Sequence, residues 1–500
     1  MNDDLVILAR AHAPILLLVV PLTGAALAAL SLSGRLAWLI ATLASAISAA
    51  AAIDVAIDVQ RVGARLYNVS DWGAPLGVTL RVDGLGAFGL SLTAVSAALA
   101  ILSSIGPLRR EVDHKRQPLA MALCLLINCG ALGMIAAGDL FTMFAFMQMS
   151  VIASAALVGM GAEQDRRAGP AALRMLLWNG TGACLYAFGA GLLFLSTGSF
   201  DVAGAAGVLN AAEHARGAVA GVALVITGLA IMAALAPLHA GLVAALGRGP
   251  TFAAMLLGGA LAPAGLMALA RLMALLAGAA APGVSSGASV ALLALGVTSV
   301  LIGSLQACVA TDLRRLAAYA IAAQAGCVAI GLSTGNQDGM VGALFHAINQ
   351  AGIAFVLLGA AAQFPAGAPL SALDGLARRA PVLSAAISVA ALSLVGAPLT
   401  GGFLSKWLLL QSTFEAHFWG GAVAVVASSL LAMIYVARLF VRLYVRAPPT
   451  ESAKLARGRW TAAPAMAAAV IAALFFGVES SAPLNAARAA VDAMAWAPVR

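Results

Sequence analysis

The feature that most constrains this chain of 500 residues is a series of long apolar runs along most of its length. A helix that crosses a bilayer needs about 20 apolar residues, and about fourteen runs approach or exceed that length. Unpaired backbone polar groups are not tolerated in lipid, so runs this long, without strict alternation, are expected to be helical. The sequence therefore predicts an all-α polytopic membrane protein of about fourteen transmembrane helices. The expected helices run roughly over 13–33, 36–57, 84–106, 118–137, 139–160, 171–197, 217–245, 252–279, 287–310, 314–334, 339–362, 381–413, 420–446 and 461–478.

Composition excludes a water-soluble protein. Hydrophobic residues make up 62% of the chain and charged residues 10%, whereas soluble proteins carry roughly 25% charged residues. No phosphate-binding loop, dinucleotide fingerprint, zinc-protease motif or nucleophile elbow occurs. The five cysteines lie in apolar runs without a CxxC pair, so no metal site is indicated. We expect no enzymatic activity from the chain by itself and no cofactor.

The distribution of basic residues predicts the topology. The net charge is +8, and Arg and Lys gather in short clusters after the third, fifth, ninth, eleventh and thirteenth expected helices. Such clusters flank spans on the cytoplasmic side, so nucleic-acid binding is not expected. An even number of helices then places both termini on the non-cytoplasmic side. The acidic start argues against a cleaved signal peptide, and the Ala-rich composition suggests a bacterial inner membrane.

Two expected helices are interrupted. Pro237 lies within 217–245, and Pro398, Gly401 and Gly402 lie within 381–413. Both interruptions contain Ala-Pro-Leu and are five helices apart, so they cross the bilayer in opposite directions, as two inverted repeats of five helices would. Proline and glycine are also common in ordinary membrane helices. The expected division is helices 1–3 in 1–110, the repeats in 118–280 and 287–446, and a C-terminal loop and helix in 447–500.

A few ionisable residues fall inside or at the ends of the expected helices, where such groups are costly and usually functional. Lys406 follows the second interruption, with snorkelling to the interface as the alternative. His239 and His346 are candidate proton relays, although a hydrogen-bonded histidine in a helix interface fits equally well. Asp139 begins a helix, where capping also explains a carboxylate. Arg174 is either a topology charge or a partner for a neighbouring helix.

Several segments resemble the antiporter-like membrane subunits shared by complex I and Mrp-type cation/proton antiporters, and the D subunit of the Mrp complex is the most similar. The resemblance covers roughly residues 70 to 445. The segments that carry it are Asp83-Gly84-Leu85, Gly138-Asp139-Leu140-Phe141, Pro237-Leu238-His239, Asp312-Leu313-Arg314-Arg315, Phe345-His346-Ala347-Ile348-Asn349 and Gly402-Phe403-Leu404-Ser405-Lys406-Trp407. It implies a fold of fourteen helices with two inverted five-helix repeats and broken helices 7 and 12.

The resemblance also implies a chain of titratable residues, and this sequence departs from it. Where the family has a glutamate in helix 5, lysines in helices 7 and 8, and a histidine and a lysine in helix 11, this chain has side chains that cannot exchange protons. These are Gln148, Met232, Pro263, Gln350 and Ala354. Lys406, His239 and His346 remain, and Arg174 stands where the family has a lysine. The first half-channel is therefore expected to be inactive.

Three functions stay open from the sequence. The first is a subunit of an Mrp-like cation/proton antiporter or a complex-I-related assembly, which packs beside homologous and smaller membrane subunits and handles protons with sodium or potassium. The second is a structural subunit of such a complex that does not transport. The third is a membrane-arm subunit of a quinone oxidoreductase or a hydrogenase, whose cofactors would belong to its partners.

Overall fold

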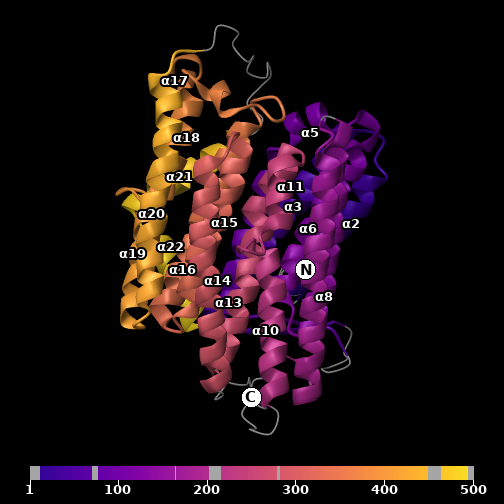
Figure 1. Ribbon diagram of the computed structural model, residues 1–500. Helices are drawn as coiled ribbons and strands as arrows, with labels where there is room; N and C mark the ends of the chain where they lie inside the picture. Colours follow the sequence, from indigo (N-terminus) through magenta and orange to yellow (C-terminus); the bar gives the residue numbers. More distant parts are fainter. Residues whose placement is uncertain are drawn as a thin grey trace.

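The computed structural model describes residues 12–69, 77–163, 165–201, 215–278, 282–448 and 463–493. These residues form an elongated bundle in which most helices run along the long axis (Figure 1). Ten of the described helices are long and apolar enough to cross a membrane, or eleven when the bent pair at the C-terminal end counts as one span. The all-α membrane class is thus confirmed. The count of fourteen spans and the repeat boundaries stay predictions.

The helices follow the apolar runs closely. Helices of the first part are α2 (Ala13–Ala29), α3 (Gly34–Val62), α4 (Gly84–Leu102), α5 (Ile105–Glu111), α6 (Gln117–Ala136), α7 (Leu140–Gly159), α8 (Ala168–Thr197), α10 (Ala215–Met232), α11 (Ala240–Arg248), α12 (Thr251–Leu256), the π-helical turn η4 (Leu257–Leu261) and α13 (Ala262–Gly278). Those of the second part are α14 (Pro282–Val309), α15 (Leu313–Ser333), α16 (Gln337–Ala361), α17 (Leu376–Arg379), α18 (Pro381–Val395), α19 (Gly401–Glu415), α20 (Trp419–Phe440), the π-helical turn η6 (Val441–Val445), α21 (Ala463–Val478) and α22 (Ser481–Asp492). Short 3₁₀ turns occur at η1 (His114–Arg116), η2 (Met160–Glu163) and η5 (Leu370–Leu373).

Asparagine and aspartate side chains start several of the spans. The carboxylates of Asp83, Asp139 and Asp312 accept hydrogen bonds from backbone N–H groups three residues further on, at 2.8, 2.6 and 2.9 Å. Asn336 does the same at the start of α16, at 2.8 Å. The first N–H groups of a helix have no partner inside the helix, so these caps determine where the spans begin.

Small residues bring two helix pairs into close contact. A Cβ atom added to Gly228 of α10 would lie 2.5 Å from the carbonyl oxygen of Gly182 of α8, and one added to Gly326 of α15 would lie 2.6 Å from that of Gly296 of α14. Both distances exclude any larger side chain. In lipid, where the hydrophobic effect does not drive helices together, such close backbone packing is a main source of stability. The pair α8–α10 lies in the first predicted repeat and the pair α14–α15 in the second.

Several short elements were not expected from the sequence, and two of them join distant parts of the chain. A short antiparallel hairpin, β1 (Arg65–Asn68) and β2 (Thr79–Val82), precedes α4, with Arg65 opposite Val82 and Asn68 opposite Thr79. The final helix, predicted as 461–478, is followed by α22, which is bent by 86° from α21 and contacts α4 and α16. These elements are short or weakly apolar, so a search for long apolar runs does not find them.

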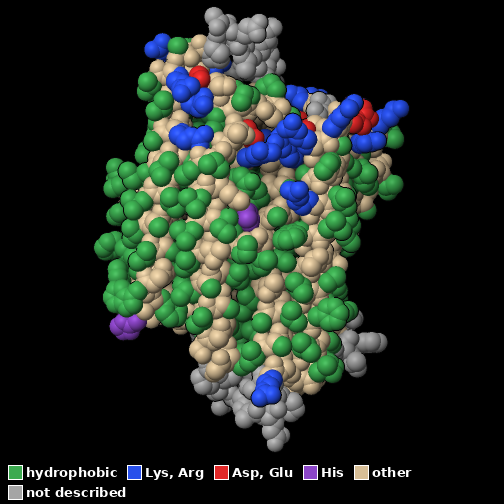
Figure 2. Space-filling view, viewed as in Figure 1, with side chains coloured by type: hydrophobic (Ala, Val, Ile, Leu, Met, Phe, Trp, Pro, Cys, Tyr) green, Lys and Arg blue, Asp and Glu red, His purple; other side chains and the backbone are tan. Residues whose placement is uncertain are grey.

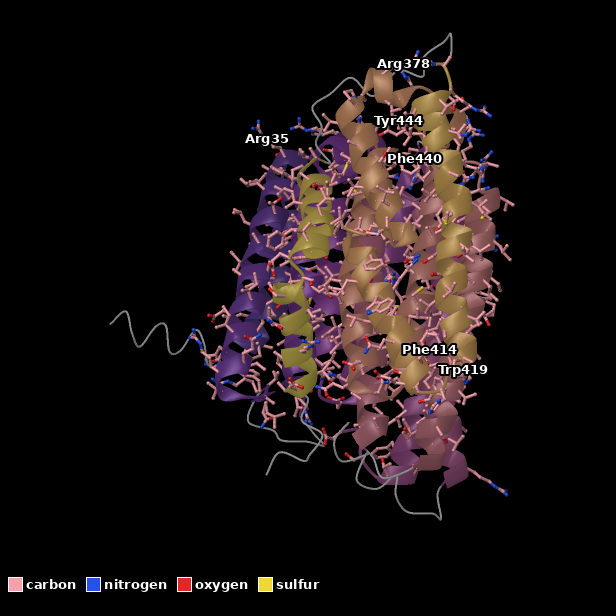
Figure 3. The ribbon with its side chains drawn as sticks, turned by 90° about the vertical axis from the view of Figure 1, so that its left-hand side faces the viewer. Arg35, Arg378, Phe414, Trp419, Phe440 and Tyr444 are labelled. Carbon is pink, nitrogen blue, oxygen red and sulfur yellow. The ribbon has the colours of Figure 1, made fainter. Side chains whose placement is uncertain are left out.

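Charged side chains gather at one end of the bundle. On the face in Figure 2, hydrophobic side chains cover the middle, and Lys and Arg concentrate near the end where α5, α11 and α17 lie in Figure 1. Arg35 and Arg378 lie at this end, whereas Phe414 and Trp419 lie toward the other (Figure 3). We call this the arginine-rich end. Loops far apart in the sequence therefore place their basic residues together.

Candidate functional site

The helical path is interrupted at both of the places marked by Ala-Pro-Leu. The first break separates α10, which ends at Met232, from α11, which begins at Ala240. The second separates α18 from α19, between Val395 and Gly401. Each break contains a non-glycine residue in the left-handed region, Ala234 with φ 60° and Leu399 with φ 67°. Such backbone is uncommon for residues with a Cβ and often occurs at functional sites.

The prolines and glycines of these breaks have different surroundings. Pro237 and Pro398 are exposed, whereas Gly401 and Gly402 are buried. A Cβ atom on Gly402 would lie 2.0 Å from the carbonyl oxygen of Ser393, so this position requires glycine for the close approach of α19 to α18. Pro398, Gly401 and Gly402 thus lie where the chain leaves α18 and starts α19 beside its end.

Hydroxyl groups from α14 stabilise the first break. The backbone N–H of Ala236 donates to Ser299 Oγ at 2.9 Å, and the Ser299 hydroxyl donates to the carbonyl of Ala322 at 2.8 Å. The indole N–H of Trp178 donates to the carbonyl of Leu238. A broken helix at membrane depth is tolerated where neighbouring groups pair its freed backbone atoms.

Lys406 lies at the second break and is 6% exposed. Its Nζ donates to the carbonyl of Leu394 at 2.7 Å and to Ser429 Oγ at 3.1 Å, with the carbonyl of Val395 at 3.5 Å. Leu394 and Val395 are the last residues of α18, and the carbonyl end of a helix attracts a cation. No carboxylate within the described ranges lies within 4.0 Å of this ammonium group. Lys406 is therefore buried, not snorkelling, and is held by backbone and hydroxyl oxygens.

His346 connects three helices next to Lys406. The fully buried ring places Nδ1 2.8 Å from Ser405 Oγ of α19 and Nε2 3.0 Å from Gln324 Oε1 of α15. Ser405 directly precedes Lys406 in the sequence. The second half thus contains a polar cluster of Gln324, His346, Ser405 and Lys406, which are buried, and Ser429, which is partly buried; two members, His346 and Lys406, can gain and release a proton.

His239 links the first break to the second half. Its Nε2 lies 2.8 Å from Gln306 Oε1 of α14, and its ring centroid is 6.2 Å from that of Tyr319 of α15. The side chain is 8% exposed, and Nδ1 has no partner within the described part of the chain. The histidine therefore lies at the junction of the two halves, with one ring nitrogen available for another contact.

The five positions at which the resemblance predicts a lost titratable side chain differ in burial. Met232, Gln350 and Ala354 are fully buried, Pro263 is buried, and Gln148 is partly buried. Met232 Sδ accepts a weak bond from Asn179 Nδ2 at 3.7 Å, and Gln350 Nε2 donates to the carbonyl of Ile321 at 3.5 Å. Four of these five positions are therefore interior, and the predicted loss of titratable groups at them stays a prediction.

Pro263 also changes the backbone. Proline has no N–H, so the usual helical bond to the carbonyl four residues earlier, that of Gly259, cannot form at residue 263. The π-helical turn Leu257–Leu261 lies directly before α13, where this bond is missing. The proline thus coincides with a local change of helical pitch.

Asp139 and Arg174 are not brought into the polar cluster. Asp139 caps α7 through Oδ1, and its Oδ2 has no partner within the described residues. Arg174 is exposed on α8, and no hydrogen bond or ion pair joins it to another described residue. Their part in an ion path stays a prediction.

Arg271 of α13 is a buried charged residue that was not among the predicted site residues. This arginine is 7% exposed; its Nη2 forms a 2.9 Å ion pair with Asp83, and its Nη1 donates to the carbonyls of Arg81 and Ala137 at 3.2 and 3.3 Å. It ties α13 to the β2–α4 connection and to the end of α6. The signal was available, because an arginine within the apolar run 252–279 is costly unless paired.

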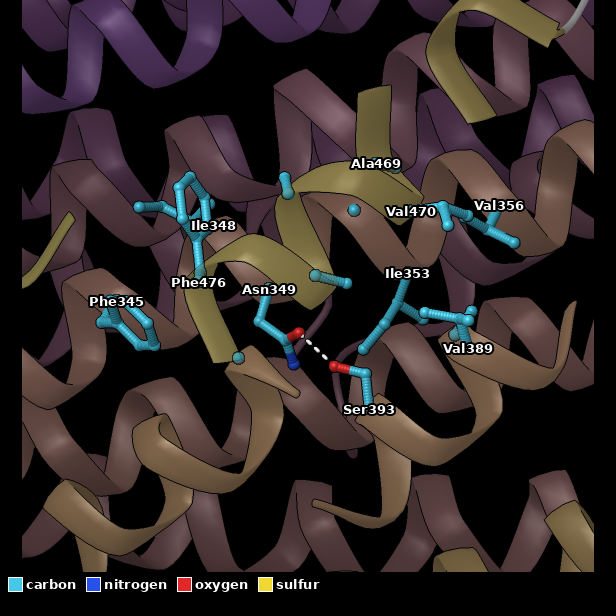
Figure 4. A pocket seen from close by; sticks show the side chains of 15 residues that line it. Phe345, Ile348, Asn349, Ile353, Val356, Val389, Ser393, Ala469, Val470 and Phe476 are labelled. Carbon is cyan, nitrogen blue, oxygen red and sulfur yellow. Dashed lines mark hydrogen bonds between the residues drawn. The ribbon is translucent and has the colours of Figure 1, made fainter. Parts of the chain in front are cut away.

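A small cavity lies beside the second break. Its volume of 20 Å³ suits about one water molecule. Asn349, Ser393 and Gly401 line it, together with Phe345 and Phe476 (Figure 4). The Ser393 hydroxyl donates to Asn349 Oδ1 at 2.5 Å, whereas Asn349 Nδ2 has no partner among the described residues. Asn349 and Ser393 are thus the polar side chains of a lining that is otherwise apolar.

These features define a class: a helical membrane protein with two broken helices and a buried titratable group beside each of them. Residues 137–432 match the family described as "NADH:quinone oxidoreductase/Mrp antiporter, TM". The chain is also 33% identical over 456 residues to NADH-quinone oxidoreductase subunit N of Desulforudis audaxviator, and the match covers 89% of each chain. This protein belongs to the NADH:quinone oxidoreductase/Mrp antiporter transmembrane family.

Solved structures share the fold. A chain of the Mrp complex from a Dietzia species superposes with a TM-score of 0.85 at 20% identity, covering 96% of this chain and 97% of that one. A chain of the membrane-bound sulfane sulfur reductase, an archaeal respiratory membrane complex, superposes with a TM-score of 0.86 at 23% identity and the same coverage. At this identity the likeness shows the fold alone.

Proposed function

We propose that this chain is a membrane subunit of a complex-I-like or Mrp-like assembly in a bacterial inner membrane, and that it takes part in proton translocation through its second half. The observation that supports this proposal most is the polar cluster beside the second break, in which Gln324, His346, Ser405 and Lys406 are buried and Ser429 is partly buried. A lysine that costs free energy to bury is expected to have a function. Helix breaks at membrane depth occur where a path or cavity is lined.

The first half-channel is inactive in this proposal. Gln148, Met232 and Pro263 occupy interior positions without an exchangeable proton, and His239 is hydrogen-bonded to Gln306 of the second half. Proton transfer through the first half would need a titratable side chain in place of one of these residues.

The repeats and the topology extend the same proposal. The repeats 118–280 and 287–446 are supported by the paired breaks, which lie five expected helices apart. The basic loops at the arginine-rich end make that end cytoplasmic, with both termini on the other side. Homologous and smaller membrane subunits are the expected partners, because the similar structures come from multi-subunit membrane complexes.

Two assemblies compete within the family. The relative that is 33% identical over most of both chains is named subunit N of NADH-quinone oxidoreductase. The assignment to the D subunit of an Mrp complex depends on the motifs and on a fold likeness at 20% identity. We therefore favour the complex-I-like assembly, in which redox chemistry would belong to partner subunits.

Proton flux in liposomes that contain the purified complex tests the proposal. Lys406→Ala should slow the flux about 100-fold, the order expected for loss of a proton-transferring group. Lys115→Ala, which removes an exposed lysine, should leave it unchanged. Normal flux with Lys406→Ala would remove this lysine from the mechanism.

A structural subunit is the second candidate. Lys406 donates to three oxygen atoms and His346 contacts two partners, so both are also satisfied as components of a static core. An intact complex whose flux is the same when this chain carries Lys406→Ala would favour the structural role.

A further inference from the structure

A second group of charged residues lies around a cavity at the arginine-rich end, apart from Lys406 and His346. The cavity has a volume of 390 Å³, enough for several water molecules. Its lining comes from α5, α11, α12, the start of α15 and the segment after α16, so it lies where both halves of the chain meet. The charged side chains in the lining are Arg110, Glu111, Asp165, Arg248 and Arg314.

Glu111 is held in this cavity by one residue. Its Oε2 accepts from the backbone N–H of Thr251 at 2.6 Å, and its Oε1 accepts from the Thr251 hydroxyl at 2.5 Å. Burial raises the pKa of the Glu111 carboxyl, although the Thr251 hydrogen bonds and the charges of Arg314 and Arg110 act in the opposite direction. The carboxyl group is therefore easier to protonate than one in open water.

The other charged groups of the cavity are already engaged. Asp165 forms an ion pair with Arg248 at 3.8 Å. Arg110 Nη2 donates to the carbonyl of Ala362 at 3.2 Å, and Arg314 Nη2 donates to the carbonyl of Leu246 at 3.1 Å and to that of Gly249. No cation within the described ranges lies within 4.0 Å of Glu111. Of the two acids, Glu111 is thus the one that can take up a proton without breaking an ion pair.

Thr251 suits both protonation states of Glu111. A hydroxyl group both donates and accepts. When the carboxylate is charged, the Thr251 hydroxyl donates to Oε1; when Oε1 carries a proton, that O–H donates to the hydroxyl oxygen and the hydroxyl proton turns away. The Thr251 N–H stays on Oε2 in both states. Uptake and release of a proton therefore need a rotation of one hydroxyl group and no movement of the helices.

Arg314 provides a charge that opposes permanent protonation. It is 8% exposed, and its Nε has no partner within the described part of the chain. A buried guanidinium at the edge of the cavity favours the charged form of a nearby carboxyl. The positive charge of Arg314 lowers the pKa of the Glu111 carboxyl and burial raises it, so the two effects oppose each other. Neither protonation state is then strongly excluded, which an acid that exchanges its proton requires.

We propose that Glu111 is a proton-exchanging acid in a water-accessible vestibule at the arginine-rich end, and that it takes up protons there for the chain. In the loading step a hydronium ion in the cavity transfers a proton to Oε1, so that one O–H bond breaks in hydronium and one forms on Glu111. The reverse step releases the proton. This role in uptake depends on the proposed translocation function, whereas proton binding at Glu111 does not.

Infrared spectroscopy of the purified complex tests proton binding. A carboxyl band should appear as the pH falls, with a midpoint above that of exposed glutamates, and Glu111→Gln should abolish it. The matched control is Glu163→Gln, which removes an exposed glutamate paired with Arg116 and should leave this band in place. Absence of the band in the wild type, or its persistence in Glu111→Gln, would overturn the assignment.

Thr251→Val provides a second test that keeps the carboxyl group and covers the case in which Glu111→Gln does not assemble. Loss of the donated hydroxyl bond destabilises the charged form. The midpoint of the band should therefore move to higher pH. An unchanged midpoint would show that the band does not belong to Glu111.

Proton flux separates this inference from the proposed function. Glu111→Gln should slow the flux of the reconstituted complex about tenfold, and Glu163→Gln should not. Wild-type flux with Glu111→Gln would overturn the uptake role even if the band is lost. A wild-type complex without any flux would overturn the proposed function and the uptake role, and the infrared titration would still decide whether Glu111 binds a proton.

Discussion

The two helix breaks have similar backbones but different side chains. Both contain Ala-Pro-Leu and one non-glycine residue in the left-handed region. At the first break, Ser299 pairs the backbone and the interior residue is Met232; at the second, Lys406 donates to the end of α18. A broken helix therefore persists without a buried charge, provided that neighbouring groups pair its backbone. The charge at the second break is an addition to this architecture.

Substituting Met232 by the lysine found at the second break, and Lys406 by methionine, tests whether the broken backbone is independent of a buried charge. Met232→Lys should have the largest effect. Residue 232 is fully buried beside Asn179. An unpaired buried charge should lower the free energy of unfolding by about 3–5 kcal/mol. Chemical unfolding in detergent measures this free energy of unfolding. The control is Met232→Leu, which should lower the free energy of unfolding by less than about 1.5 kcal/mol. Unchanged stability of Met232→Lys would show that the first break still accommodates a charge.

The reverse exchange, Lys406→Met, should separate stability from transport. Replacing a buried charge by an apolar side chain of similar length is often nearly neutral for stability. The proton flux should nevertheless fall about 100-fold, which corresponds to about 2.7 kcal/mol, because methionine cannot carry a proton. Lys115→Met is the matched control. Severe destabilisation of Lys406→Met would instead indicate that the lysine organises the second break.

His346→Ala should have a smaller effect. It removes the link between Ser405 and Gln324, and we expect the flux to fall about tenfold, or about 1.4 kcal/mol. His346→Gln can keep hydrogen bonds but cannot relay a proton, so it should recover stability without recovering flux. His417→Ala, at an exposed histidine, is the control. Full flux with His346→Gln would make the histidine a structural group.

The contact between the halves at the first break should have the smallest effect. A double-mutant cycle with His239→Phe and Gln306→Leu should give a coupling energy of about 0.6 kcal/mol, the average for hydrogen bonds between membrane helices. As a control, Gln411→Leu replaces Gln306→Leu in the cycle; Gln411 lies on α19 and contacts Glu415. This cycle should give no coupling energy with His239→Phe. Zero coupling between His239 and Gln306 would contradict the link between the halves.

Much of the fold could be predicted because its signals are local. The apolar runs located the helices within a few residues, and the aspartates at positions 83, 139 and 312 lie where an N-cap is needed. Both interruptions coincide with real breaks. The hairpin β1–β2 and α22 were missed because short or amphipathic segments give no long apolar signal.

The candidate site was predictable only in part. Lys406 and His346 stand out because ionisable groups are rare in lipid, but Gln324 and Ser429 resemble any polar residue in a membrane helix. Arg271 was detectable by the same rule and was overlooked. Glu111 looked like a loop residue, because nothing near it in the sequence indicates that Thr251, 140 positions away, will enclose its carboxyl group.

The sequence by itself determined that this chain forms apolar helices, where two of them break, and which side chains are able to carry a proton. These properties depend on neighbouring residues and on the lipid solvent, and both can be read along the chain. The tertiary structure alone decided that Lys406 faces the end of α18, that His239 contacts Gln306, and that Glu111 lies in a cavity between the halves. Those contacts join helices far apart in the sequence, and close packing of the whole bundle determines which of them meet.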